Sequence, residues 1–221
     1  MLKAIKPMDI EKCSFEIITR ELGDRLLDPE NELVIKRVIH TTADFDYAEN
    51  LCFSEHAVKK GIEALRSGCD IVTDTQMAKA GINKTILGRL GGEVHCFMSD
   101  PDVAEEAKDR GVTRAMVSME RAAELEKPCV FAIGNAPTAL FSLLELIEAG
   151  RVRPALIVGV PVGFVNVVES KERLLEVCRR HGVPAIVALG RKGGSNVAAA
   201  ICNALLYSAA GQLDPAARGW Q

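Results

Sequence analysis

The stretch of residues 129–150, CVFAIGNAPTALFSLLELIEAG, decides the fold class of this 221-residue chain. Its first five residues are continuously apolar, which is typical of a short strand buried on both faces of a parallel sheet. Gly134 and Asn135 then form a loop, and Pro137 fits the first position of a helix that we expect to end at Ala149. The stretch therefore predicts one strand–loop–helix unit.

The same unit recurs on both sides of this stretch. We expect further strands at residues 69–73, 94–98, 155–160 and 185–189. We expect helices at residues 54–67 (capped by Ser54), 101–110, 114–126, 170–181 and 195–209. This alternation predicts an α/β fold, a doubly wound and mainly parallel sheet with helices on both faces. We expect a single domain over residues 1–210 and a tail at residues 211–221.

Two helices are expected before the alternating region. Pro7 fits the first turn of the first helix, and Gly23 can end it. Its apolar positions are Ile10, Phe15, Ile17, Ile18 and Leu22. We expect Asp28 to cap the second helix, Pro29 to begin it, and Thr42 to lie at its end.

His40 is the strongest candidate among the four histidines for a role in proton transfer. It lies near the end of the second helix, where the macrodipole favours its protonated form. Arg37 lies one turn earlier and opposes this effect, so the pKa of His40 is expected near neutrality. We expect His56 and His181 on solvent-facing helices and His95 in a strand as a core residue.

The composition excludes several classes of protein. The net charge of −3 argues against binding of nucleic acid through bulk positive charge, and no uninterrupted apolar run is long enough to span a membrane. The N-terminus contains no signal peptide pattern. The seven cysteines form no CxxC pair, so we expect neither a disulfide framework nor a metal site, and a reducing, cytoplasmic location.

Four loops rich in glycine and small residues follow the expected strands, at residues 73–76, 134–138, 159–165 and 190–196. Ligands of open parallel sheets bind at this carboxyl edge, and Gly-rich turns that lead into helices present N–H groups to carboxylates or phosphates. Each loop taken alone is also compatible with a simple tight turn. The chain has neither of the Gly-rich nucleotide fingerprints and no nucleophile elbow of a hydrolase.

Read in order, these motifs resemble the precorrin-8 methylmutase family, in its cobalt-dependent or its cobalt-free branch. The resemblance extends from about residue 13 to residue 205. The matching segments are RVIH at 37–40, GNAPTAL at 134–140, VGFV at 162–165, ESK at 169–171 and GRKGGS at 190–195.

The resemblance implies an isomerase that moves a methyl group from C11 to C12 of a corrin precursor without a resident cofactor. His40 matches the catalytic histidine of the family, while Ser14, Arg37 and Arg114 match residues that contact the substrate. From the loops we expect substrate contacts at Asn135, Thr138, Gly163, Arg191, Gly193 and Ser195, with Lys192 also available to hold carboxylates. The family is homodimeric, so the resemblance also implies a homodimer whose partner chain completes the site.

Three interpretations remain open on the sequence. The main one is a cobalt-precorrin-8 methylmutase that gives cobyrinate, with His40 as proton donor and acceptor. The cobalt-free alternative is a precorrin-8X methylmutase that gives hydrogenobyrinate. A protein that binds an acidic tetrapyrrole without catalysis would keep the arginines and loops but would not need His40. A nucleotide-dependent enzyme is disfavoured, because its fingerprints are missing.

Overall fold

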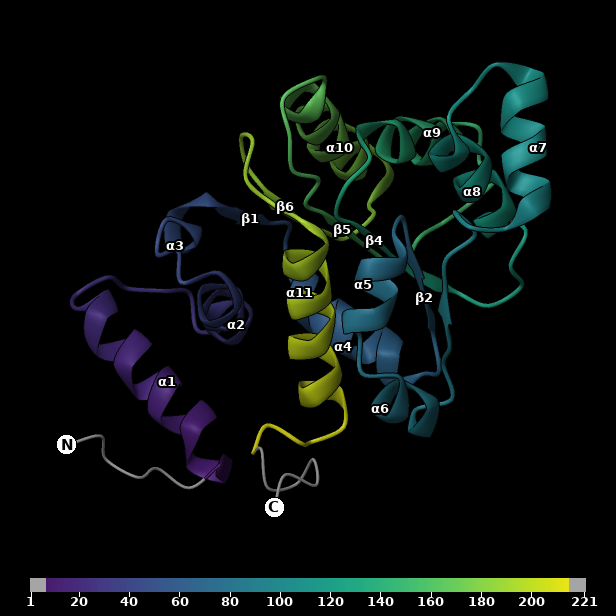
Figure 1. The fold of residues 1–221 in the computed structure, drawn as a ribbon. Helices are drawn as coiled ribbons and strands as arrows, with labels where there is room; N and C mark the ends of the chain where they lie inside the picture. The colour runs from purple at the N-terminus through teal and green to yellow at the C-terminus, as the bar shows by residue number, and fades with distance from the viewer. Residues whose placement is uncertain (1–6, 215–221) are drawn as a thin grey trace.

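The computed structural model describes residues 7–214, and a six-stranded sheet forms its centre (Figure 1). The strands are β1 (Leu51–Phe53), β2 (Asp70–Thr73), β3 (Val94–His95), β4 (Cys129–Ile133), β5 (Leu156–Gly159) and β6 (Ala185–Ala188). They lie in the order β1-β6-β5-β4-β2-β3. Only the β1–β6 pair of this sheet is antiparallel, so the predicted mainly parallel α/β architecture is confirmed.

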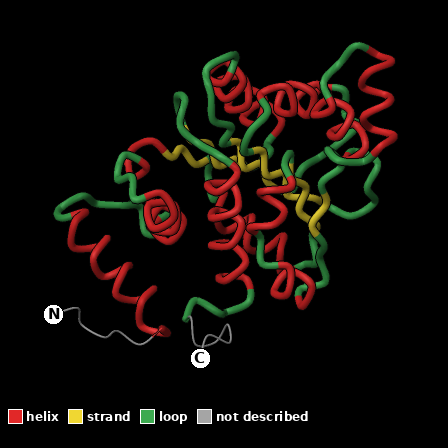
Figure 2. The backbone as a smooth tube through the Cα atoms, in the orientation of Figure 1, coloured by secondary structure: helices red, strands yellow, loops and turns green. Residues whose placement is uncertain are grey.

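Helices cover both faces of the sheet (Figures 1 and 2). One face carries α7 (Pro101–Arg110), α8 (Arg114–Ala122), α9 (Pro137–Glu148) and α10 (Val167–His181). The other carries α4 (Ala57–Arg66), α5 (Gln76–Gly81), α6 (Lys84–Arg89) and α11 (Ser195–Ala209). The N-terminal helices are α1 (Pro7–Leu22), α2 (Glu32–Thr42) and α3 (Tyr47–Asn50). Helix α2 packs against α11, and α1 packs against α2.

Strand β4 shows how the side chains divide between two hydrophobic cores. Val130 and Ala132 pack into the cluster that contains α2, α4 and α11. Phe131 and Ile133 pack into the cluster that contains α8, α9 and α10. Successive residues of a strand point to opposite faces, and here both faces are covered, which explains the continuously apolar sequence.

The region between residues 43 and 67 differs from the prediction. A helix was expected over residues 54–67 with Ser54 as its cap, but α4 spans Ala57–Arg66. The Ser54 hydroxyl instead accepts a hydrogen bond from the Ala185 amide at 2.9 Å. The preceding residues form β1, which pairs with β6 at the edge of the sheet. Strand β1 was not predicted, because three residues are too few to show a period. Ser54 was therefore assigned to the helix instead of to the end of this strand.

Helix boundaries also differ from the prediction near α2. Asp28 caps a turn rather than the helix: its carboxylate accepts from the Glu30 amide at 2.9 Å, and α2 begins at Glu32. The predicted end at Thr42 is confirmed, with Ala43 in a left-handed conformation. The sequence interpretation missed the short helices α3, α5 and α6, because four to six residues are too few for a clear helical period.

The termini are described only in part. Of the expected tail, residues 215–221 lie outside the described range, and the chain turns at Gly211 after α11. Within residues 7–214, no helix is long and apolar enough to cross a bilayer.

Candidate active site

His40 lies in the last turn of α2, with its ring stacked on the ring of Phe15 from α1. The two ring centroids are 5.4 Å apart and the planes differ by 13°. The residue as a whole is exposed to solvent, although one face of its ring is covered by Phe15. His40 is therefore held in orientation by an aromatic surface while an edge of the imidazole stays accessible to a ligand.

Arg37 is a buried cation one helical turn before His40. Its guanidinium donates to the Glu11 carboxylate at 2.8 Å and lies over the rings of Phe15 and Tyr207, at 4.7 and 5.3 Å from their centroids. The residue is only 7% exposed, so this ion pair does not lie on a solvent-facing helix surface. Its buried Nε has no hydrogen-bond partner among the described residues.

The surroundings of His40 lower its pKa below the ordinary value of 6.5. Burial is the largest cause, because it disfavours the charged imidazolium. The Arg37 guanidinium lowers the pKa further, and the Glu11 carboxylate opposes both effects. Arg37 thus acts in the predicted direction, and together with burial it favours the neutral imidazole of His40 relative to a free histidine.

Ser14 lies beside this cluster on α1. Its hydroxyl donates to the Ile10 carbonyl at 2.8 Å within the helix, so the serine oxygen keeps lone pairs for a further contact. Ile18 and Leu22 of α1 are buried, as expected for its inner face. Ile10 and Ile17 point away from it and are 52% and 43% exposed.

The backbone of the loop at Gly134–Ala136, which follows β4, is anchored by the Asp74 side chain. The fully buried Asp74 carboxylate accepts from the backbone N–H groups of Gly134, Asn135 and Ala136, at 2.9, 2.8 and 2.6 Å. We expected these N–H groups to face a ligand, and that expectation is wrong, because Asp74 already occupies them. The exposed Asn135 side chain remains available at this position.

The backbone of the loop at Gly190–Gly193, which follows β6, is anchored by the side chain of Lys171 from α10. The Lys171 ammonium donates to the carbonyls of Gly190 and Lys192, at 2.8 and 2.7 Å. The backbone of Gly193 also forms a hydrogen bond to the Tyr47 hydroxyl of α3. Unlike the loop after β4, this loop is tethered mainly through its carbonyl groups.

Lys192 connects this loop to the segment that follows His40. Its ammonium forms ion pairs at 2.6 Å with both Asp44 and Asp46, and it lies 5.8 Å from the centroid of the Tyr47 ring. We expected Lys192 to hold substrate carboxylates, but its charge is already balanced by two aspartates. Its position instead links the end of α2 to the carboxyl edge of the sheet.

Arg191 is exposed and stands beside an apolar segment of the loop after β5. Its guanidinium lies 5.3 Å from the centroid of the Phe164 ring, which is 80% exposed. The Gly163 amide donates to the Arg191 carbonyl at 3.3 Å, so the two loops are joined at this point. A cation and an exposed aromatic ring side by side suit a ligand that is both acidic and flat.

Ser195 begins α11 and joins the other loops of the carboxyl edge. Its hydroxyl lies 2.8 Å from the Thr75 hydroxyl. Gly134 approaches so closely that a Cβ there would lie 2.7 Å from the Ser195 Cα, which explains why this position needs glycine. The loops at this edge thus contact one another, as we expected from their placement after parallel strands. They carry Asn135, Gly163, Arg191, Gly193 and Ser195.

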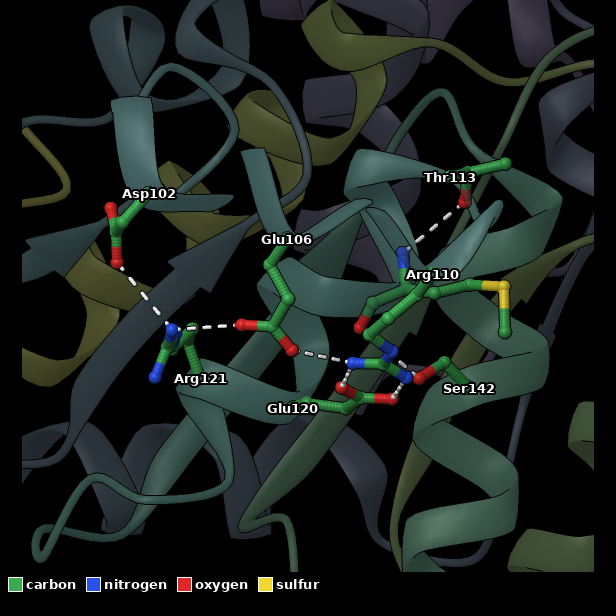
Figure 3. Close-up of polar contacts among 8 residues, drawn as sticks. Asp102, Glu106, Arg110, Thr113, Glu120, Arg121 and Ser142 are labelled. Atoms are coloured by element: carbon green, nitrogen blue, oxygen red, sulfur yellow. Dashed lines mark hydrogen bonds and ion pairs between the residues drawn. The ribbon is translucent and has the colours of Figure 1, made fainter. Parts of the chain in front are cut away.

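Thr113, the residue before Arg114, connects the start of α8 to Thr138 at the start of α9. The Thr113 hydroxyl caps α8 by accepting from the Met116 amide, and it donates to the Thr138 hydroxyl at 3.0 Å. Figure 3 shows the polar contacts that hold α8 between α7 and α9: Arg110 with Glu106 and Glu120, Arg121 with Asp102 and Glu106, and the Ser142 hydroxyl with the Met116 carbonyl. Arg114 itself is exposed at the start of this fixed helix.

The candidate residues therefore fall into two groups within one chain. Ser14, Arg37 and His40 surround the end of α2, close to Tyr207, whereas the loop residues surround the start of α11 at Ser195. Because a helix rises 1.5 Å per residue, Tyr207 lies about 18 Å along α11 from Ser195. The Lys192 ion pairs with Asp44 and Asp46 join the two groups.

The sequence interpretation missed three residues that shape this region, namely Asp74, Tyr47 and Lys171. Asp74 lay within the loop at residues 73–76, which was singled out as a whole, and Lys171 belonged to a matching motif; neither had an assigned role. Their partners lie far along the chain, at a separation of 60 residues for Asp74 and Gly134, so only the fold reveals their function.

Comparisons with known proteins find relatives over nearly the whole chain. A family model described as precorrin-8X methylmutase matches residues 9–208. A cobalt-precorrin-8 methylmutase of Salmonella typhimurium is 51% identical over 91% of this chain and 95% of its own length. One of Priestia megaterium is 45% identical over 91% and 88%. The crystal structure of a precorrin-8x methyl mutase from Thermus thermophilus has a TM-score of 0.83, with 40% identity and coverage of 92% and 98%.

Proposed function

The chain belongs to the precorrin-8X methylmutase family, and from this premise we propose that it is a cobalt-precorrin-8 methylmutase. One observation carries the proposal: nearly the whole chain is similar to cobalt-precorrin-8 methylmutases, at identities of up to 51%. The reaction is an isomerisation, in which the bond from the methyl carbon to C11 breaks and a bond to C12 forms. No atom or electron is gained, so the ring that enters and the ring that leaves have the same composition.

His40 is the proposed proton donor and acceptor of this reaction. Protonation of the conjugated ring polarises it at the carbon that receives the methyl group, and the proton returns to the imidazole after the shift. Histidine suits this exchange because its pKa lies within reach of physiological pH. Stacking on Phe15 supports the role, since it fixes the ring while leaving an edge accessible.

Charged groups of both clusters are the proposed contacts to the carboxylates of the substrate. Arg191 and Arg114 are exposed cations on fixed elements, and guanidinium groups form strong, directional hydrogen bonds with carboxylates. Arg37 lies one helical turn before His40, and this position supports its proposed contact with the bound ring. Ser14, Asn135, Thr138, Gly163, Gly193 and Ser195 complete the proposed binding surface.

We further propose a homodimer that acts in the cytoplasm. The Lys192 ion pairs join the His40 group to the loop group within one chain, and we propose that a second copy completes the binding surface around them. All seven cysteines are free, which suits a reducing compartment. Sedimentation of the purified chain at several concentrations tests the dimer, and a monomer at all concentrations would contradict it.

The decisive experiment supplies cobalt-precorrin-8 and precorrin-8X separately and follows conversion by the visible spectrum. We expect turnover of the cobalt form, and faster turnover of the cobalt-free form would assign the chain to the other branch. His40→Ala should lower kcat by about 10²- to 10⁴-fold. The matched control is His56→Ala, because His56 is an exposed histidine that immediately precedes α4, on a different part of the chain. Tight binding without conversion of either ring would indicate a tetrapyrrole-binding protein.

A further inference from the structure

Lys171 is a fully buried ammonium that the reaction itself does not use. It lies on α10, is 1% exposed, and donates to the carbonyls of Gly190 and Lys192. Burial of a charge is costly, and a hydrophobic residue of similar size would avoid that cost. Stability alone therefore does not explain a lysine at this position. Its contacts point to a role in the conformation of the Gly190–Gly193 loop.

The contacts of Lys171 set the orientation of two peptide groups. In a trans peptide the N–H points opposite to the C=O, so the carbonyls of Gly190 and Lys192, turned toward Lys171, aim the N–H groups of Arg191 and Gly193 away from it. The Gly193 group meets the Tyr47 hydroxyl. The exposed Arg191 is thus presented to solvent with a fixed positive charge behind its backbone.

The loop has little freedom to adopt another shape. Gly193 has φ +152°, and a Cβ there would lie 2.1 Å from the Val160 carbonyl oxygen. The Gly194 amide also donates to this oxygen at 2.9 Å. A rigid backbone fixes the distance between the buried ammonium and whatever binds outside the loop.

We propose that Lys171 is a positioning residue for substrate binding, which orients the Gly190–Gly193 loop and supplies a buried positive charge that attracts a carboxylate of the substrate. The inference rests on the proposed function, because it requires an acidic ligand at this edge. Burial weakens screening by water and salt, so a charge behind the loop acts on the ligand more strongly than an exposed lysine at the same distance.

The pH dependence of this charge can be separated from that of its neighbours. Burial lowers the pKa of Lys171 to about 8. Of the elements around it, β6 carries no ionisable side chain, α9 carries Glu145 and Glu148, and the loop carries Arg191 and Lys192. Carboxylates and arginine keep their charge between pH 7 and 9, and the two aspartates beside Lys192 raise its pKa. Only the Lys171 charge is expected to disappear from this group in that range.

The test compares the intact chain with Lys171→Met in binding of the product cobyrinate and in turnover of cobalt-precorrin-8. At pH 7 we expect Kd and KM to rise about tenfold in the variant while kcat changes by less than about threefold, since the residue does not touch the reacting atoms. Between pH 7 and 9 the KM of the intact chain should rise, whereas that of the variant should stay flat. Lys127→Met is the matched control, because Lys127 precedes the amino end of β4, at the opposite end of the strand from the loops, and donates to the Gly91 carbonyl there.

Several results would overturn the proposal. An unchanged KM in Lys171→Met, or a loss confined to kcat, would do so. If the variant does not fold, the intact chain decides alone, since a KM that is flat from pH 7 to 9 contradicts a role for the charge. If the chain binds cobyrinate but converts no substrate, the proposed function fails, and the Kd values still test Lys171. Absence of any binding to cobyrinate would overturn both.

Discussion

The loops at Gly134–Ala136 and at Gly190–Gly193 lie at the same edge of the sheet but are held in opposite ways. The first is held by an anion: the Asp74 carboxylate accepts three of its backbone N–H groups. The second is held by a cation: the Lys171 ammonium donates to two backbone carbonyls of the loop. Asp74 therefore orients N–H groups of its loop toward the protein interior, whereas Lys171 orients C=O groups of its loop inward.

This difference shows which loop suits an acidic ligand. Asp74 uses up the N–H groups of its loop and places a negative charge behind them, so only side chains such as Asn135 remain for contacts. Lys171 draws carbonyl oxygens inward and leaves a positive charge behind Arg191. Two loops that look alike in sequence, each glycine-rich and each leading into a helix, therefore present different electrostatic surfaces.

Removal of Asp74 should have the largest effect on stability. Asp74→Ala leaves one buried and two partly buried N–H groups without their acceptor, and we expect a loss of about 3–5 kcal/mol in the free energy of unfolding. Urea denaturation of the purified chain measures this loss. Asp102→Ala is the control, because Asp102 is an exposed carboxylate on α7 and should change stability by less than about 0.5 kcal/mol. A wild-type midpoint for Asp74→Ala would show that the carboxylate does not hold the loop.

A methyl group in the second loop should have the next largest effect. Gly193→Ala forces a Cβ to within 2.1 Å of the Val160 oxygen at a φ that favours glycine, and we expect a loss of about 2–4 kcal/mol. Gly190→Ala is the matched control, since φ there is +64° and no atom lies within 4 Å of an added Cβ. It should cost about 1 kcal/mol. Equal thermal midpoints for the two variants would argue against a rigid loop.

The charge of Lys171 should give stability a pH dependence of defined sign. Its folded pKa of about 8 lies below the ordinary 10.5, so the native state binds fewer protons than the unfolded state between these values. Stability of the intact chain relative to Lys171→Met should therefore rise with pH through that window. Taking the difference cancels the buried cysteines, which titrate in both proteins. A difference that is flat or falls from pH 7.5 to 9.5 would contradict the buried ammonium.

The smallest effect is expected for Lys192, which holds the outer side of the second loop. Lys192→Met removes ion pairs with Asp44 and Asp46, but these groups are partly exposed and screened by solvent. We expect a slight decrease in the thermal midpoint that shrinks further when salt is added. A loss as large as that of Gly193→Ala, or one that is insensitive to salt, would show that the tether matters more than the buried contacts.

The placement of the candidate residues could be predicted where it depended on position along an element. His40 was expected at the end of a helix near Arg37, and a helical spacing of three residues guarantees that neighbourhood. The loop residues were expected at one edge, and the parallel order of β2, β4, β5 and β6 brings them there. Burial of Arg37 was not predictable, since it depends on Glu11, Phe15 and Tyr207 from two other helices.

The sequence by itself determined the alternation of strands and helices, and with it the edge at which the loops gather. This information is local, because apolar runs and turn residues act within a few positions of one another. Only the tertiary structure decided which loop groups are free. Lys192 and Asp44 lie 148 residues apart, and Asp74 lies 60 residues from Gly134, so no local pattern encodes these contacts. Packing brings the buried charges beneath the loops, and their sign decides what each loop can bind.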